Sequence, residues 1–151
     1  MIIPVLGMDP SLRNWGLSEA QLDLTDGVLS TPIGSIIEPK DLTGKNIRVN
    51  TNDQWLAEQL AGPVLEACRK AQCIFVEVPV GSQSARAMAS YGVCVGILGA
   101  VRALGIPYIQ VMPDENKRVF TGNKGATKKQ MISKLIELYP DIILPQGQTK
   151  G

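Results

Sequence analysis

Short apolar runs separated by turn residues fill the first quarter of the chain. Ile2–Met8 predicts a strand, with Asp9 at its C-terminal end. Trp15–Leu22 and Val28–Ile37 predict two more strands, and the Asp26-Gly27 step between them is a strong signal for a hairpin. Together these segments predict a three-stranded antiparallel meander.

The pattern changes to a helical period after a polar stretch over residues 38–50, which predicts a mobile surface connection available to a ligand. From Thr51 onward an apolar residue recurs every four positions and marks one face of a helix. We expect Gly62-Pro63 to kink this helix. Its apolar face consists of Leu56, Leu60, Val64 and Cys68, and its cap is one of Asn50, Thr51 and Asn52.

A buried strand and a second helix follow. Cys73–Val78 is apolar except for Glu77, as in a strand that is buried on both faces. Ser82–Leu104 predicts a long helix in which small residues fall on nearly one face, so we expect a close neighbour there. These small residues are Gly92, Gly96 and Gly99 or Ala100.

The last elements complete a mixed sheet. Pro107–Val111 predicts a short strand, Pro113–Phe120 a short helix, and Thr127–Leu138 an amphipathic helix. The inward face of the last helix is expected to be Met131, Leu135 and Leu138. A meander followed by helix, strand, helix, strand and helix predicts one α/β domain over residues 1–151. It contains a mixed five-stranded sheet, with an antiparallel meander and added parallel strands, flanked by helices.

Composition narrows the chemistry. The chain has 151 residues, of which 44% are hydrophobic, and its net charge is +1, so no overall field draws it to nucleic acid or membrane. The absence of histidine excludes Ser-His-Asp triads, Cys-His dyads and ordinary histidine metal sites. Three cysteines without paired spacing favour a reducing cytoplasm over a disulfide framework or a thiolate zinc site. No signal peptide or membrane helix is predicted.

Two carboxylates, Asp9 and Glu77, lie in or at the end of strands expected to be central. Burying a carboxylate costs several kcal/mol unless it is paired or binds a metal. A divalent ion such as Mg²⁺ explains both residues, because it prefers oxygen ligands and supports phosphodiester hydrolysis without histidine. The alternative is purely structural: Asp9 caps the turn before Ser11, and Glu77 pairs with a lysine.

One segment is strongly basic although the chain as a whole is nearly neutral. Between residues 117 and 134 there is no acidic residue, and the segment contains Lys117, Arg118, Lys124, Lys128, Lys129 and Lys134. The hinge at residues 121–125 is rich in glycine, so its backbone amides and lysines can approach a phosphodiester. Its spacing does not match the GxxxxGK[ST] loop of nucleotide triphosphatases. The alternative is a solvated helix face with no ligand.

Three segments resemble motifs of the RuvC-type Holliday junction resolvases, a family of the ribonuclease H-like superfamily. Residues 7–16 read G-M-D-P-S-L-R-N-W-G, similar to the family's first-strand motif G-I-D-P-G-x-R-x-x-G. Residues 75–77 are similar to the strand that carries the family's second carboxylate. Residues 112–130 resemble P-x-x-V-K-x-x-V-T-G-N-G-x-A-x-K-x-Q without a gap.

This resemblance implies a ribonuclease H-like fold and a Mg²⁺-dependent endodeoxyribonuclease, with Mn²⁺ as an alternative ion, that cleaves branched DNA such as four-way junctions. It also implies a homodimer, because the helix from Ser82 resembles the one that joins the family's subunits. The catalytic positions are Asp9, Glu77, Lys117 and Lys128, of which Asp9 and Glu77 bind the metal. The expected nucleic-acid-binding residues are Arg13, Arg118, Asn123, Lys124 and Lys129.

Two departures from the family pattern affect the expected function. The family's third and fourth carboxylates lie on a C-terminal helix, whereas Asp141 is the only acidic residue after Leu138. Residues 139–151 are interpreted as a connection toward such a helix, so the domain is expected to lack it. Val80 stands near the position where some members carry an aromatic that stacks on unpaired bases. These departures suggest a phage-encoded version with relaxed selectivity among branched DNAs.

Two other functions remain open from the sequence. A catalytically silent nucleic-acid-binding module of the same fold is favoured by the missing acidic helix. An ATPase or sugar kinase of the actin-like superfamily shares the short G-x-D-x-G start, but such enzymes need a second copy of the fold that 151 residues do not provide.

Overall fold

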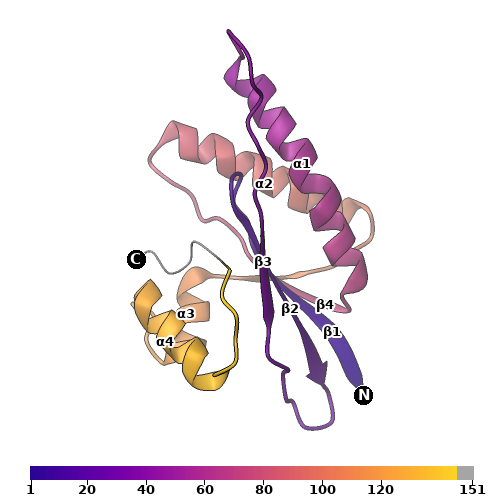
Figure 1. The fold of residues 1–151 in the computed structure, drawn as a ribbon, viewed down its shortest axis with the longest axis vertical. Helices are drawn as coiled ribbons and strands as arrows, with labels where there is room; N and C mark the ends of the chain where they lie inside the picture. The colour runs from indigo at the N-terminus through magenta and orange to yellow at the C-terminus, as the bar shows by residue number, and fades with distance from the viewer. Residues whose placement is uncertain (146–151) are drawn as a thin grey trace.

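Three antiparallel strands begin the chain, as the apolar runs predict. The computed structural model describes residues 1–145 and contains β1 (Ile2–Asp9), β2 (Trp15–Asp23) and β3 (Ile33–Ile37) (Figure 1). The hairpin of β1 and β2 pairs Asp9 with Gly16 at the end where the site is expected. The meander therefore sets the position of the first carboxylate.

The third strand is shorter than predicted. The sequence predicts a strand over Val28–Ile37, but only the last five residues of that range form β3, and upstream a single bridge joins Leu29 to Leu22. Pro32 separates the two parts. Because proline has no N–H to donate to a strand ladder, the regular pairing begins only after it.

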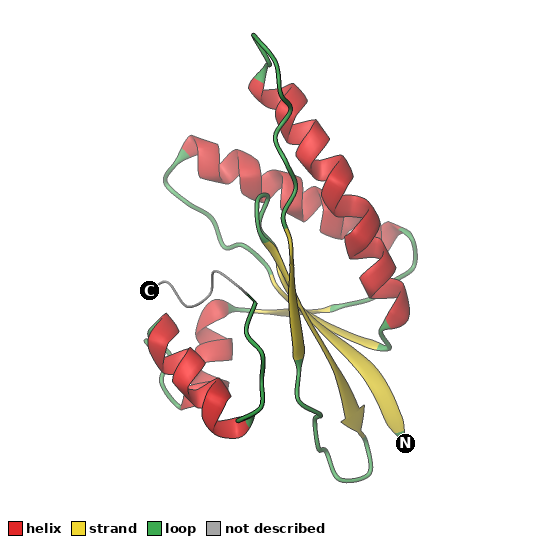
Figure 2. Cartoon of the chain, in the orientation of Figure 1, coloured by secondary structure: helices red, strands yellow, loops and turns green. Residues whose placement is uncertain are grey.

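The first helix, α1 (Val49–Lys70), begins earlier than expected and is not capped by the predicted side chains. Its N-cap is Arg48, which makes no side-chain capping bond. Instead of capping, Asn52 accepts a hydrogen bond from the Leu42 N–H at 2.8 Å, so it ties the connection over residues 38–48 to the helix. The helix continues through Gly62 and Pro63, so the kink expected at this step does not end it (Figure 2). Both are exposed, where water can hydrate the unpaired carbonyl.

The remaining strands add in parallel. β4 (Cys73–Glu77) pairs with β1, and β5 (Ile109–Val111) pairs with β4, which gives the strand order β3-β2-β1-β4-β5. The predicted mixed five-stranded α/β sheet is confirmed. β4 is not buried on both faces, however: Ile74 and Val76 are buried, whereas Phe75 between them is 40% exposed. One face of the sheet is therefore largely open.

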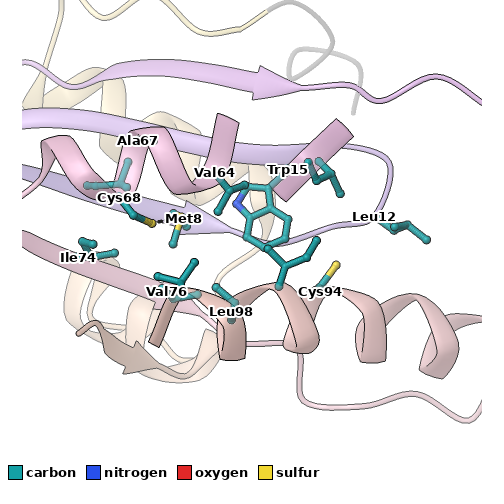
Figure 3. Packing of buried hydrophobic residues seen from close by; sticks show 14 of the residues in the cluster. Met8, Leu12, Trp15, Val64, Ala67, Cys68, Ile74, Val76, Cys94 and Leu98 are labelled. Carbon is teal, nitrogen blue, oxygen red and sulfur yellow. Dashed lines mark hydrogen bonds between the residues drawn. The ribbon is translucent and has the colours of Figure 1, made fainter. Parts of the chain in front are cut away.

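The hydrophobic core lies on the other face, under α1 and α2 (Ala85–Ala103). Ser84 caps α2 by accepting a hydrogen bond from the Ala87 N–H. Figure 3 shows the core side chains filling the space between the sheet and these two helices. The largest fully buried members are Trp15, Leu6, Leu56, Leu60, Leu98, Val64, Val76, Cys68 and Cys94.

The small residues of α2 do not pack as expected within the chain. A Cβ atom built on Gly92, Gly96 or Gly99 would meet no neighbouring atom within 4 Å in the described chain. The close neighbour expected beside these glycines is therefore not part of the described chain, because the glycines face outward. Of the three, Gly96 borders an apolar groove of about 650 Å³ between α1 and α2, lined in part by Ala57, Ala61 and Val93.

Two short helices, α3 (Pro113–Thr121) and α4 (Lys128–Leu138), lie on the opposite side of the sheet from α1 and α2 (Figure 1). Gly122 ends α3 in the left-handed conformation with φ 78°, as a glycine hinge requires. No residue of either helix is fully buried. The predicted inward face of α4 is only partly correct, because Met131 and Leu135 are half-buried but Leu138 is 49% exposed. Within the described residues, no helix has the length and apolar character needed to span a membrane.

Residues 139–145 form an irregular connection, as predicted from the sequence. It returns across the open face of the sheet, where Pro145 lies beside Gly34 of β3. The part of the predicted connection after residue 145 lies outside the described residues.

Candidate metal and nucleic-acid site

Asp9 and Glu77 end two adjacent parallel strands. The register pairs Gly7 with Phe75 and Met8 with Val76, so the next residues, Asp9 and Glu77, project to the same face as Gly7 and Phe75. This is the open face of the sheet, opposite the core. Parallel pairing of β1 and β4 therefore brings together two carboxylates that are 68 positions apart in the sequence.

Both carboxylates line a hollow of about 410 Å³ on this face. Its floor is the sheet, and its walls come from α3, α4 and the irregular connection, through Asn116, Leu135 and residues 142–145. The carboxylates are only partly buried: by residue surface Asp9 is exposed and Glu77 half-buried, although the hollow removes some of the water around the Asp9 carboxyl group. Each stands at the end of its strand, where the chain leaves the sheet and water can enter.

The electrostatics of the hollow favour a cation. Partial loss of water around Asp9 raises the pKa of its carboxyl group, and the nearby charge of Glu77 raises it further, whereas Lys128 lowers it. Neither carboxylate forms an ion pair in residues 1–145. Two repelling oxygen ligands on one face match the donor set that Mg²⁺ or Mn²⁺ takes. No third aspartate, glutamate, cysteine or histidine completes a cluster in the described part of the chain.

Asn116 contacts Glu77, which the sequence analysis did not anticipate. The Asn116 Nδ2 donates a hydrogen bond to the Glu77 Oε2 at 2.6 Å. The sequence gives one hint of this contact. The motif that residues 112–130 resemble has a valine at the position of Asn116. A single polar residue in place of an apolar one does not reveal its partner 39 positions away.

The expected basic residues are distributed unevenly around the hollow. Lys128 begins α4 and is close enough to affect the pKa of Asp9. Lys117 is half-buried in α3, and no described hydrogen bond or ion pair links its side chain to Asp9 or Glu77. The structure thus brings one of the two predicted catalytic lysines, Lys128, near enough to Asp9 to interact with it electrostatically.

The other expected nucleic-acid-binding residues lie on exposed surface. Arg118, Lys124 and Lys129 are exposed on α3, the hinge and α4. Asn123 is exposed too, and its Oδ1 accepts a hydrogen bond from the Gly125 N–H at 2.9 Å, which supports the hinge. Arg13 lies in the turn after β1, where it donates to Asp41 at 2.7 Å.

A second charged pair, also missed from the sequence, fixes the helices behind the site. Both terminal nitrogens of Arg86 donate to Asp53 at 2.6 Å, and Asp53 is 7% exposed. Hydrogen bonding by the guanidinium holds the pKa of the Asp53 carboxyl below its usual value. Because Arg86 lies in the first turn of α2, the pair anchors the helix that follows Glu77 and its loop.

The fold is similar to that of two solved RuvC structures. The structure of RuvC from T. thermophilus in complex with a Holliday junction substrate superposes with a TM-score of 0.70 at 16% identity, covering 95% of this chain and 84% of that one. A structure of Thermus thermophilus RuvC alone gives a TM-score of 0.66 at 18% identity, covering 97% and 83%. No protein-family model matches the sequence, and no curated protein matches it.

These likenesses place the chain in the α/β class of ribonuclease H-like folds. Within that class, its mixed five-stranded sheet and flanking helices are arranged as in RuvC over most of both chains. The fold expected from the three sequence motifs is thereby confirmed.

Proposed function

We propose that this protein is a divalent-metal-dependent endonuclease that hydrolyses phosphodiester bonds in branched DNA. The observation that carries this proposal is that Asp9 and Glu77 lie together on the open face of the sheet. The fold is similar to that of a RuvC structure in complex with a Holliday junction substrate. Because Asp9 and Glu77 are far apart in the sequence, it is the fold that brings the two carboxylates together. The absence of histidine agrees with hydrolysis supported by a metal.

Asp9 and Glu77 are the residues that would hold Mg²⁺ or Mn²⁺, because they present oxygen ligands and lack another cationic partner in residues 1–145. When bound, such an ion neutralises phosphate charge and acidifies a water molecule. Lys128 offsets negative charge beside Asp9 and is placed to contact the scissile phosphate. We assign the same role to Lys117 on the basis of its motif.

The α3–α4 hairpin provides the proposed DNA-binding surface. Its exposed basic residues carry the positive charge that phosphate binding requires, and one exposed lysine of the hairpin, Lys128, lies near Asp9. Arg13 extends this surface from the turn after β1, although Asp41 neutralises part of its charge. The expected members are Arg13, Arg118, Asn123, Lys124 and Lys129.

Replacing Lys124 or Lys129 with alanine is expected to weaken binding to all branched DNAs to a similar degree. Each loss of a phosphate contact should reduce the slope of log affinity against log salt by about 1. Gel-shift titrations at several salt concentrations measure this slope. Lys70→Ala is the matched control, because Lys70 is an exposed lysine on α1 that pairs with Glu66 away from the hairpin. An equal loss in the control would contradict the assigned surface.

We propose that the protein acts as a homodimer through the groove between α1 and α2. The groove is apolar, and outward-facing glycines on α2 allow another backbone to approach closely. A two-fold dimer also matches the symmetry of a four-way junction, with one site for each of two strands.

Gly96→Leu is expected to convert the dimer to a monomer, because its side chain would fill the groove without clashing inside the chain. Sedimentation velocity at micromolar concentration measures the change. Gly62→Leu serves as control, since Gly62 lies on the exposed side of α1 and also has free space around it. A wild-type monomer, or a Gly96→Leu dimer, would show that the glycines have no role in assembly.

The direct test of the proposed function is cleavage of a four-way junction, a three-way junction and a linear duplex with Mg²⁺, Mn²⁺ or chelator. We expect metal-dependent cleavage of the branched substrates and little cleavage of the duplex. Cleavage that persists in chelator would contradict the assignment. A catalytically silent binding module is the second candidate, favoured by the two-carboxylate set of the described residues. It predicts junction binding without cleavage in either metal.

A further inference from the structure

Asn116 occupies a fixed position above the Glu77 carboxylate. β5 pairs Val111 with Glu77, and α3 begins two residues later, so the first turn of this helix lies beside the end of β4. The turn is held by Glu115, whose Oε2 accepts a hydrogen bond from the Met112 N–H at 3.0 Å. The Asn116 N–H donates to the Met112 carbonyl at 3.0 Å, which fixes the backbone from which its side chain extends.

In the contact between Asn116 and Glu77, the amide is the donor and the carboxylate is the acceptor. An ionised carboxylate only accepts hydrogen bonds, so the amide must present its Nδ2 to Glu77, and the 2.6 Å separation is that of a charge-assisted bond. The bond uses Oε2, and Glu77 Oε1 forms no hydrogen bond in residues 1–145. One carboxylate oxygen is thus held by protein while the other remains available in the hollow shared with Asp9.

The neutrality of the amide matters at this position. A lysine here would supply a competing positive charge, and a third carboxylate would add to the repulsion between Asp9 and Glu77 on this face of the sheet. An asparagine orients Glu77 without altering the charge of the site. A ligand carboxylate that is itself hydrogen-bonded loses less freedom when it binds a metal ion.

We infer that Asn116 is a positioning residue, which orients Glu77 so that its free oxygen points toward a divalent cation shared with Asp9. This inference rests on the proposed metal-dependent function. It gives α3 a second residue in the site besides Lys117. It also explains why this chain has a polar residue where the resembled motif has valine.

The test replaces Asn116 with valine and measures Mn²⁺ binding in the intact protein by paramagnetic broadening of ¹⁵N-labelled resonances. In the wild type, the side-chain amide of Asn116 should broaden at low Mn²⁺, whereas that of Asn50, exposed in the first turn of α1, should not. Broadening of the Asp9 and Glu77 amides should need about tenfold more Mn²⁺ in Asn116→Val, the usual cost of losing a residue that orients a metal ligand. Asn50→Val is the control variant and should leave this concentration unchanged.

Kinetics provide the second measurement. Asn116→Val should lower kcat at subsaturating metal and leave KM for the junction unchanged, since the basic residues of the hairpin are retained. A merely structural role would lower the thermal midpoint but leave Mn²⁺ affinity intact. Wild-type binding of Mn²⁺ with equal affinity in a folded Asn116→Val would overturn this inference alone. Absence of Mn²⁺ binding and of cleavage in the wild type would overturn the proposed function and this inference together.

Discussion

Asp9→Asn and Glu77→Gln are each expected to reduce Mg²⁺-dependent cleavage of a four-way junction by about a thousandfold or more. The removed interaction is the metal-mediated stabilisation of transition-state charge, which is worth several kcal/mol. Junction binding should remain or become stronger, because a carboxylate that faces a phosphate without metal is repulsive. Single-turnover cleavage and gel-shift titration on the same protein preparations separate these two effects.

Glu66→Gln is the matched control for this experiment, since Glu66 is an exposed carboxylate on α1 that pairs with Lys70. It should cleave at the wild-type rate. Normal cleavage by Asp9→Asn would contradict a site centred on Asp9. Binding of the linear duplex as tightly as the junction at about 0.15 M salt would contradict junction selectivity.

Asp9→Asn should also change the thermal stability of the protein in the absence of DNA. The folded-state pKa of Asp9 is raised, so the folded protein holds this proton more firmly than the unfolded chain, and stability is lost as the pH rises through the folded pKa. At neutral pH and without metal, Asp9→Asn should therefore melt at the same temperature as the wild type or higher. Mg²⁺ should raise the melting temperature of the wild type but not that of the variant.

Trp15→Ala is expected to lower the free energy of unfolding by about 3–5 kcal/mol, the usual cost of truncating a fully buried large aromatic residue. Trp15 is 0% exposed and is among the largest fully buried side chains of the core. Urea unfolding at equilibrium measures the loss. Trp55→Ala is the control, because Trp55 is 38% exposed on α1 and should cost less. A larger loss for Trp55→Ala would contradict the described core.

Trp15→Phe should cost less than the lost volume suggests. The indole Nε1 is buried and has no hydrogen-bond partner in residues 1–145, so phenylalanine removes an unpaired donor along with packing atoms. Because Gly16, the next residue, pairs with Asp9 across the hairpin, Trp15 also anchors the strand that positions the first carboxylate.

The sequence predicts the elements whose signals are local and periodic. Short apolar runs bounded by turn residues predict the strands, and the four-residue period predicts the buried face of α1, from Leu56 to Cys68. That Asp9 and Glu77 meet is implied by the resemblance to the RuvC-type family, and the parallel pairing of β1 with β4 brings both to one hollow. Two local details were not predicted from the sequence and are seen only in the structure. β3 is shorter than expected because of Pro32, and Asn52 bonds to a loop instead of capping α1.

The contacts that shape the site were not predictable in the same way. Asn116 with Glu77 and Arg86 with Asp53 join residues 39 and 33 positions apart, and each depends on the packing of two complete elements. No period or spacing in one sequence records such a pairing. The open face of the sheet was missed for a similar reason, because a run such as Cys73–Val78 is equally apolar whether one or both faces are covered.

The lack of fully buried residues in α3 and α4 has an evolutionary consequence. Substitutions on this hairpin change charge and shape where DNA is expected to bind, while the core under α1 and α2 remains intact. Selection for a different branched substrate can therefore act on the hairpin with little penalty in folding.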